Sequence, residues 1–150
     1  GDPVYVIDEY LEQVAKDHKE ERMKALESGD GKGRAAITID HPRDFSKLEL
    51  SDNKIKFDGW ALTDDEAANL IITLDNEAVE YDLCKRTDVY EVYKEIYAGF
   101  IDENRIGWIF YRNLNDLGVG EHKLKVQYID KKGNILDEKE CQFKVLNEVA

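Results

Sequence analysis

Apolar and polar residues follow a strand-like pattern along most of the chain from about residue 35 onward, with turn-forming residues between the runs. A period of two is typical of strands that bury one face and expose the other. The strand-like runs are residues 35–40, 55–57, 79–83, 106–111, 124–128 and 141–145. Residues 70–74 are apolar on both faces and predict a central strand. About seven or eight short strands predict a mostly β fold, an immunoglobulin-like antiparallel β-sandwich.

A long amphipathic helix is predicted before these strands. One narrow apolar stripe recurs at helical spacing through Val4, Ile7, Leu11 and Val14. The other faces of this helix are almost entirely charged, so it is suited to packing on a partner rather than to forming a core. Glycines at 29, 31 and 33 then predict a flexible linker. The chain therefore divides into a helix at 1–28, a linker at 29–34 and a β-sandwich domain at 35–150.

One short helix is predicted between the strands, starting near residue 88. Asp88 and Glu91 have the spacing of a capping box, in which Asp88 accepts hydrogen bonds from first-turn amides and Glu91 reaches back. One helical face is then predicted to carry Val89, Val92, Tyr93 and Ile96. Gly99 is expected to end this helix.

Two turns complete the predicted outline. Residues 63–66 form a second, weaker capping box and predict a single turn between two strands. Residues 130–134 predict a hairpin turn in which Gly133 adopts a positive φ.

Composition and charge narrow the possible functions. A chain of 150 residues suffices for one domain with its own core. The net charge of −12 argues against nucleic acid and against anionic membrane surfaces, because both require clustered lysine and arginine. No apolar run is long enough to span a bilayer and no signal peptide is recognisable, which favours a cytoplasmic location.

The two cysteines do not indicate a disulfide scaffold or a zinc site. Cys84 and Cys141 both lie in strand-like segments, where a free cysteine usually acts as a small buried apolar residue. A single bridge between them and a reactive thiol are the alternatives. Neither a Cys-x-x-Cys pair nor a His-x₃-His pair is present, so we expect no metal site and no cofactor.

Both tryptophans are candidates for stacking on a sugar ring. Trp60 is out of phase with Ile55 and Phe57, so it should point to the opposite face unless Gly59 marks a bulge. It then lies either in a second core or partly exposed as a binding platform. Trp108 is in phase with neighbouring apolar residues, which favours the main core.

Charged residues offer weaker candidates for ligand binding. Arg86 could hold a ligand together with Asp88, or it could form a bidentate contact with a nearby carboxylate and fix the loop. The acidic residues of 58–66 lack the spacing of a calcium loop, so a solvated acidic loop is expected there.

Nothing in the sequence predicts catalysis. The histidines His18, His41 and His122 have no serine or cysteine nucleophile motif beside them. The glycine pair at 118 and 120 precedes a strand rather than a helix, unlike a phosphate-binding loop. We therefore expect a non-catalytic protein.

A set of ordered motifs resembles a known family. The motifs are Gly59-Trp60-Ala61-Leu62, Arg86-Thr87-Asp88-Val89, Tyr93, Gly99-Phe100 and the Gly120, Asp130 and Gly133 hairpin. Together they resemble an immunoglobulin-like domain appended to bacterial glycosyltransferases and methyltransferases of cell-surface polysaccharides. The similarity covers about residues 50–146. Thr87 and Lys94 stand where the family has proline, which makes this loop less rigid than in the family.

The resemblance implies an accessory domain of a larger glycosyltransferase-type protein, which binds carbohydrate or positions an upstream catalytic domain. Trp60, Arg86 and Tyr111 are then the candidate carbohydrate-binding residues, and the partner is a glycan or the catalytic domain. The alternative is an interaction or scaffolding domain that forms a homodimer, or docks on a neighbour, through its N-terminal helix.

Overall fold

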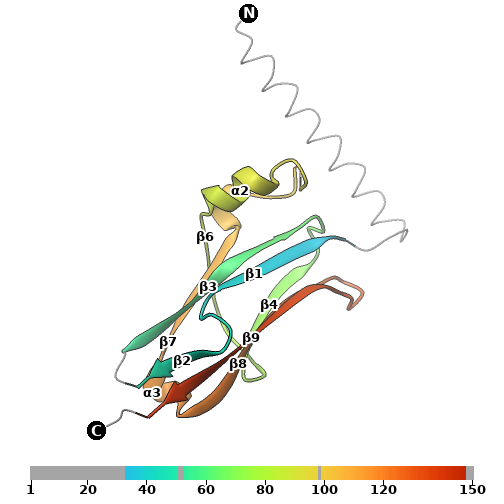
Figure 1. Ribbon diagram of the computed structural model, residues 1–150. Coiled ribbons are helices and arrows are strands. Elements are labelled where there is room, and N and C mark those ends of the chain that lie inside the picture. The colour runs from blue at the N-terminus through green and yellow to red at the C-terminus, as the bar shows by residue number, and fades with distance from the viewer. Residues whose placement is uncertain (1–32, 51–52, 98, 148–150) are drawn as a thin grey trace, which may run out of the picture.

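The computed structural model describes residues 33–50, 53–97 and 99–147 (Figure 1). In these residues nine strands, β1 to β9, form two sheets packed face to face. The predicted N-terminal helix at 1–28 and most of the predicted linker at 29–34 lie outside the described residues. Within the described residues, no helix is both long enough and apolar enough to cross a membrane.

The two sheets differ in size. The first has four antiparallel strands in the order β1 (Ala35–His41), β3 (Lys54–Thr63), β7 (Gly107–Asn113) and β6 (Asp82–Cys84). The second has five strands in the order β2 (Ser46–Glu49), β9 (Ile135–Leu146), β8 (Gly120–Ile129), β4 (Asn69–Leu74) and β5 (Glu77–Ala78). Pairing in the second sheet is antiparallel except between β2 and β9, which are parallel.

Three short helical segments connect the strands. They are α2 (Thr87–Tyr93), the 3₁₀ turn η1 (Glu103–Arg105) and α3 (Leu114–Leu117). α2 lies at one end of the sandwich and α3 at the other (Figure 1). The two ends of the sandwich are therefore called the α2 end and the α3 end.

The strand order is that of an immunoglobulin-like sandwich, which confirms the predicted fold class. When the strands β1, β3, β4, β6, β7, β8 and β9 are lettered A to G in chain order, the first sheet reads A-B-E-D and the second contains G-F-C. This is the arrangement of constant-type immunoglobulin domains. The chain leaves the first sheet after β1 and joins the second as β2, so its first segment contributes to both sheets.

The main core lies between the sheets and is apolar throughout. Its centre consists of fully buried side chains from four strands: Phe57, Trp108, Leu124, Val126 and Val145. The Phe57 and Phe110 rings stack with their centroids 4.6 Å apart. An antibody domain has a disulfide between its B and F strands, whereas in this core the inward-facing residues there include Phe57 and Leu124.

Both cysteines are free, so the alternative of a bridge between them is wrong. Cys141 is buried, and its thiol donates to the Pro42 carbonyl at 3.2 Å. Burial raises the pKa of Cys141 to about 11, which leaves the thiol protonated and unreactive at neutral pH. Cys84 is only half-buried, because it lies on an edge strand rather than in the core.

The predicted strands were mostly correct, with three differences. The run at 79–83 is not one strand, because the chain crosses there from β5 in the second sheet to β6 in the first. Residues 70–74 belong to β4, which lies next to the edge strand β5 rather than at the centre of its sheet. The short elements β2 and α3 were not predicted, since four residues are too few to establish a period.

Candidate functional site

The outer face of the four-stranded sheet carries the candidate functional residues. On β3, Ile55 and Phe57 are buried in the core, whereas the alternate residues point outward. On β7, Trp108 and Phe110 point inward and Tyr111 points outward. Trp60 and Tyr111 therefore belong to one face, and the side chain of Arg86 lies over Gly107 on the same face.

Trp60 lies at the end of this face that is next to α2. Its register with Gly107 continues an unbroken ladder between β3 and β7, so Gly59 does not mark a bulge. Trp60 is half-buried, and its ring lies 5.3 Å from the ring of Tyr93. It packs on a second, smaller cluster of buried residues: Leu62, Val89, Tyr97 and Ile106. The predicted opposite orientation of Trp60 is thus confirmed, and its main contact is a second core.

Gly59 is required for a different reason. It faces the main core, where a Cβ atom would clash with the Thr38 carbonyl oxygen and would lie 2.6 Å from Cζ2 of Trp108. The glycine therefore lets the buried indole pack directly against the strand backbone. The Nε1 atom of Trp108 is buried and has no hydrogen-bond partner among the described residues.

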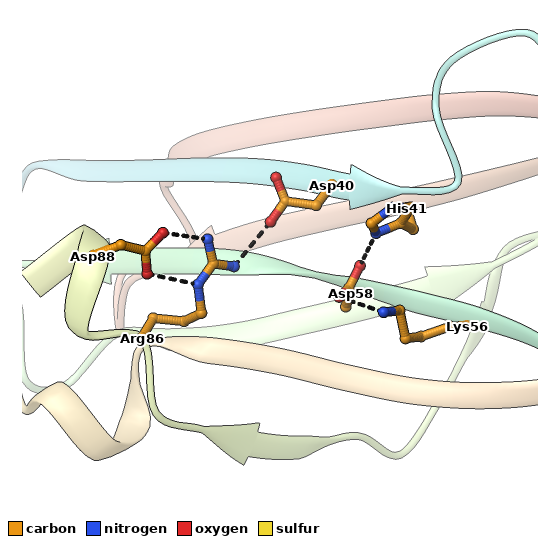
Figure 2. A network of polar contacts seen from close by, with 6 residues as sticks. All are labelled: Asp40, His41, Lys56, Asp58, Arg86 and Asp88. Atoms are coloured by element: carbon orange, nitrogen blue, oxygen red, sulfur yellow. Dashed lines mark hydrogen bonds and ion pairs between the residues drawn. The ribbon is translucent and has the colours of Figure 1, made fainter.

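Arg86 fixes the loop that leads into α2, as one of the two interpretations of its sequence predicted (Figure 2). Its Nε and Nη2 donate to the two carboxylate oxygens of Asp88 at 3.0 and 2.9 Å. Its Nη1 donates to Asp40 of β1 at 2.9 Å. The hydrogen bonds from Arg86 lower the pKa of Asp88 to about 2, and Asp88 contributes most to raising the pKa of Arg86. The guanidinium is therefore held mainly by the fold.

The predicted capping box is wrong. The helix α2 begins at Thr87 with Arg86 as its N-cap residue and no side-chain cap. Asp88 therefore lies one residue inside the helix, where its carboxylate pairs with Arg86. Glu91 pairs with Lys94 at 2.7 Å instead of reaching back to the helix start.

The end and the apolar face of α2 also differ from the prediction. The helix ends at Tyr93, and Gly99 has a φ of 81° in a later turn that Phe100 closes by donating to the Tyr97 carbonyl. Val92 and Ile96 do not face the domain, since they are 67% and 51% exposed. The predicted turn glycine of the β8–β9 hairpin, Gly133, does have a positive φ of 85°.

A second polar group continues the outer face toward the other end of the sandwich. Asp58 accepts a hydrogen bond from Nδ1 of His41 at 2.8 Å and forms an ion pair with Lys56 at 3.6 Å (Figure 2). The register of β1 shifts between Ile39 and His41, so that His41 rather than Asp40 is paired with Asp58. This bulge turns the His41 side chain to the outer face, where a regular strand would turn it inward.

An open groove of about 620 Å³ adjoins this polar group at the α3 end of the molecule. It lies between the crossover from β1 to β2 and the beginning of β3, and His41 and Lys56 form part of its wall. The rest of its lining is mixed in character: Pro42, Arg43, Ser46, Leu48, Asn53, Lys54, Ile55 and Leu114. Its volume is within the range typical of small-molecule sites, about 300–1,000 Å³.

Tyr111 lies beside this groove. It is paired with Lys56 across the β3–β7 ladder, and its side chain is 52% exposed. Neighbouring side chains across an antiparallel pair have Cβ atoms about 5 Å apart. The ring is thus the most exposed of the predicted site residues and lies next to a groove residue.

A solvated loop was expected for the acidic segment after β3, but part of this segment is buried. Asp64 is completely buried and accepts hydrogen bonds from the backbone N–H and Nε of Arg34 at 2.6 and 2.8 Å. Asp65 accepts from the N–H of Ala67 and forms a turn without helix. No group of residues with the character of a metal site occurs in the described ranges. Asp64 therefore anchors the start of β1.

No pattern in the sequence indicated the groove itself. Arg43, Lys54 and Asn53 were not predicted as site residues, because they belong to two segments that meet only in the folded molecule. Phe45, in the same crossover, has a φ of 63° and is 74% exposed, which is unusual for an aromatic residue. No local pattern would have identified either feature.

Comparisons with known proteins give only distant likenesses. No family model and no curated protein matches the chain. A mannanase from Thermotoga petrophila is similar with a TM-score of 0.45 and 14% identity, over 85% of this chain but only 23% of that one. Fibronectin(III)-like modules of Clostridium thermocellum CbhA are similar with a TM-score of 0.43 and 10% identity, over 76% of this chain and 100% of theirs. A mutant of the SrpA adhesin of Streptococcus sanguinis is similar with a TM-score of 0.43 and 9% identity, over 79% of this chain and 60% of that one. All three TM-scores are low, so they carry no argument about function.

Proposed function

We propose that this chain is a non-catalytic β-sandwich module that binds carbohydrate at the α3 end of its outer face. The observation that supports this best is the position of Tyr111, exposed on a sheet surface beside Lys56 and the groove. A tyrosine ring covers the apolar face of a sugar while its hydroxyl remains available for a hydrogen bond. Polar groups in the groove, such as Ser46 and Asn53, suit the hydroxyl groups of the same ligand.

Trp60 and Arg86 have supporting roles in this proposal. Trp60 is partly covered by Tyr93, and its packing on the second cluster holds α2 against the sheet. Arg86 already donates to two carboxylates, so little of its hydrogen-bonding capacity is left for a ligand. Both residues shape the face, and Tyr111 touches the ligand.

The test is to measure polysaccharide binding by affinity electrophoresis or calorimetry with the Tyr111→Ala variant. We expect its affinity to fall by about tenfold, since the loss of an aromatic stacking surface costs roughly 1–1.5 kcal/mol. Ile135→Ala, which removes another exposed apolar side chain from β9, is the matched control and should bind normally. Equal binding by both variants and the wild type would contradict the role of Tyr111.

We further propose that the module belongs to a larger protein that acts on surface glycans, with a glycosyltransferase-type domain as its partner. The ordered motifs around Gly59, Arg86 and Gly133 support this through their resemblance to such accessory domains. Determining the full coding region tests it. A transferase domain upstream would support the proposal, and a stand-alone product of 150 residues would contradict it.

An interaction domain is a second candidate, and one observation favours it. Val92 and Ile96 expose apolar side chains, and the Ile96 carbonyl accepts a hydrogen bond from Nη2 of Arg34 at 3.3 Å. An exposed apolar residue therefore lies close to Arg34, near the start of the described residues, and the sequence of residues 1–28 predicts an amphipathic helix. Under this proposal, deletion of residues 1–30 converts a dimer into a monomer in light scattering. An unchanged mass would reject it.

A further inference from the structure

The charged residues of the groove run against the composition of the chain. The sequence has 33 acidic and 21 basic residues and a net charge of −12. Nevertheless, among the described residues that line the groove, every ionisable side chain is basic: His41, Arg43, Lys54 and Lys56. An otherwise acidic molecule therefore presents a local positive region at this end.

The fold neutralises this region only in part. Asp58 lies at the edge of the groove and is shared between His41 and Lys56. Asp44, in the crossover, accepts a hydrogen bond from the N–H of Gln142 in β9. Among the described residues, Arg43 and Lys54 have no ion-pair partner, in contrast to Arg86 at the other end of the same face. Their charges are thus available to a ligand.

The backbone around Arg43 is firmly held, which makes the groove a defined site rather than a loose loop. The Arg43 carbonyl accepts hydrogen bonds from the N–H and the hydroxyl of Ser46, at 3.0 and 2.5 Å. The N–H of Phe45 donates to the Gln142 carbonyl of β9 at 2.6 Å. Opposite this crossover, β3 carries Lys54 and Lys56 on a strand paired with β7. Both walls therefore have fixed backbones.

The remaining lining indicates a ligand with both apolar and hydroxyl-bearing surfaces. Leu48 provides a partly exposed apolar side chain, while Ile55 and Leu114 lie beneath the groove in the main core. Ser46 and Asn53 provide a hydroxyl and an amide. A sugar ring offers an apolar face and polar edges, and an acidic sugar adds a carboxylate or sulfate that arginine and lysine recognise.

We infer that this groove binds an acidic polysaccharide, with Arg43 and Lys54 as the residues that contact its anionic substituents. The inference rests on the proposed carbohydrate-binding function and specifies the class of glycan. Tyr111 lies beside the groove across Lys56, so a bound chain could extend from the basic groove onto the exposed ring. Carboxylates and sulfates share the chemistry that the groove recognises.

The test compares pairs of polymers that differ only in charge. Polygalacturonate is compared with its methyl ester, and dextran sulfate with dextran, by affinity electrophoresis and calorimetry. We expect at least one acidic polymer to bind about tenfold more tightly than its neutral counterpart, and this preference to weaken with added salt. Comparing the affinities of polygalacturonate and dextran sulfate then indicates whether the groove prefers carboxylates or sulfates.

Variants of the full chain locate the binding. Arg43→Gln combined with Lys54→Gln should reduce binding of the acidic polymer about tenfold and leave thermal unfolding unchanged, since both side chains are exposed. Lys131→Gln with Lys132→Gln removes the same charge from the hairpin between β8 and β9 and should bind as the wild type does.

The possible results separate this inference from the proposed function. Equal binding of acidic and neutral polymers, unaffected by the groove variant, overturns the inference and leaves a carbohydrate-binding module. Equal binding of polyglutamate and polygalacturonate contradicts a glycan-specific groove. Failure to bind any polysaccharide rejects both the inference and the carbohydrate-binding function.

Discussion

The two faces of the four-stranded sheet are built from alternate residues of the same strands, yet they differ in almost every property. The inner face is apolar and completely filled, with Phe57 and Trp108 fully buried. The outer face carries ion pairs, a half-buried tryptophan and an exposed tyrosine, with an open groove at one end. The inner face thus forms the core that determines the fold, whereas the outer face carries the residues that we propose for recognition.

The outer face itself has two distinct ends. At the α2 end, Arg86 is bound to Asp40 and Asp88, and its charge contributes to holding the loop. At the α3 end, Arg43 and Lys54 have no ion-pair partner among the described residues. Side chains of the same chemical type therefore serve stability at one end and are available for binding at the other.

The strongest test of this difference between the faces is Gly59→Ala on the inner face. A Cβ atom there meets the backbone of β1 and the buried Trp108 ring, and neither can move without separating the strands. We expect a loss of more than about 3 kcal/mol in the free energy of unfolding. Urea denaturation followed by tryptophan fluorescence measures it. A variant as stable as the wild type would show that the core is not filled as described.

Gly107→Ala is the matched substitution on the outer face. Its Cβ atom would crowd Sγ of Cys84 and would lie 2.9 Å from Cγ of Arg86. The two nearest atoms belong to side chains, and the backbone oxygen of Cys84 is 3.2 Å away, so we expect a smaller loss of about 2 kcal/mol. The same urea titration compares the two variants. If Gly107→Ala were more destabilising than Gly59→Ala, the distinction between a rigid and an adaptable face would be wrong.

Arg86→Ala tests the stabilising end of the outer face. It leaves Asp40 and Asp88 close together without their shared cation, and we expect a loss of about 1–2 kcal/mol with little effect on glycan binding. Lys94→Ala, which breaks an exposed ion pair with Glu91, should leave the stability almost unchanged, because solvent screens the pair. Thermal unfolding and polymer binding are measured on both variants. Loss of binding without loss of stability in Arg86→Ala would place Arg86 in the ligand site.

The smallest expected effect on stability comes from His122. This polar residue lies on the inner side of the second sheet. Its ring stacks on Phe143, Nδ1 lies 2.6 Å from Asp75, and Nε2 lies 2.9 Å from the Gly118 carbonyl. Both partners only accept, so both nitrogens donate when the ring is protonated. Burial by itself lowers the pKa of His122, but the hydrogen bonds to Asp75 and Gly118 outweigh it, and the pKa is raised.

This raised pKa makes stability depend on pH in a defined direction. Because the folded state favours the protonated ring, the contribution of His122 is complete below the unfolded pKa of about 6.5 and is lost as the pH rises through the folded pKa. Urea titrations at pH 5.5, 6.5 and 8 should show a decline in the wild type above pH 6.5 that is weaker in His122→Asn. Parallel profiles for the two proteins would exclude a contribution from this residue.

Much of the fold could be predicted from the sequence, because the relevant signals are local. Alternation at residues 55–57, 124–128 and 141–145 predicted strands that exist, and the phase of Trp60 predicted its face correctly. The capping box at Asp88 failed because its carboxylate has a stronger partner in Arg86 than in the first-turn amides. Local spacing could not reveal that competition.

The candidate site was predictable only in part. The pairing of Arg86 agrees with one of the two interpretations of its residue chemistry, whereas the exposure of Tyr111 is established only by the folded structure. The groove was not predictable, because it needs the β1–β2 crossover to meet the start of β3. The bulge that turns His41 outward likewise depends on the pairing of β1 with β3, which no single segment encodes.

The sequence by itself therefore determined the class of fold, the first strand from about residue 35 and the faces on which Trp60 and Trp108 lie, since side-chain periodicity is a property of each segment alone. Only the tertiary structure decided which charges are neutralised and which are available. Arg86 meets Asp40 across 46 residues of sequence, and Arg43 meets Lys54 at one groove, because strand register and crossovers bring distant segments together.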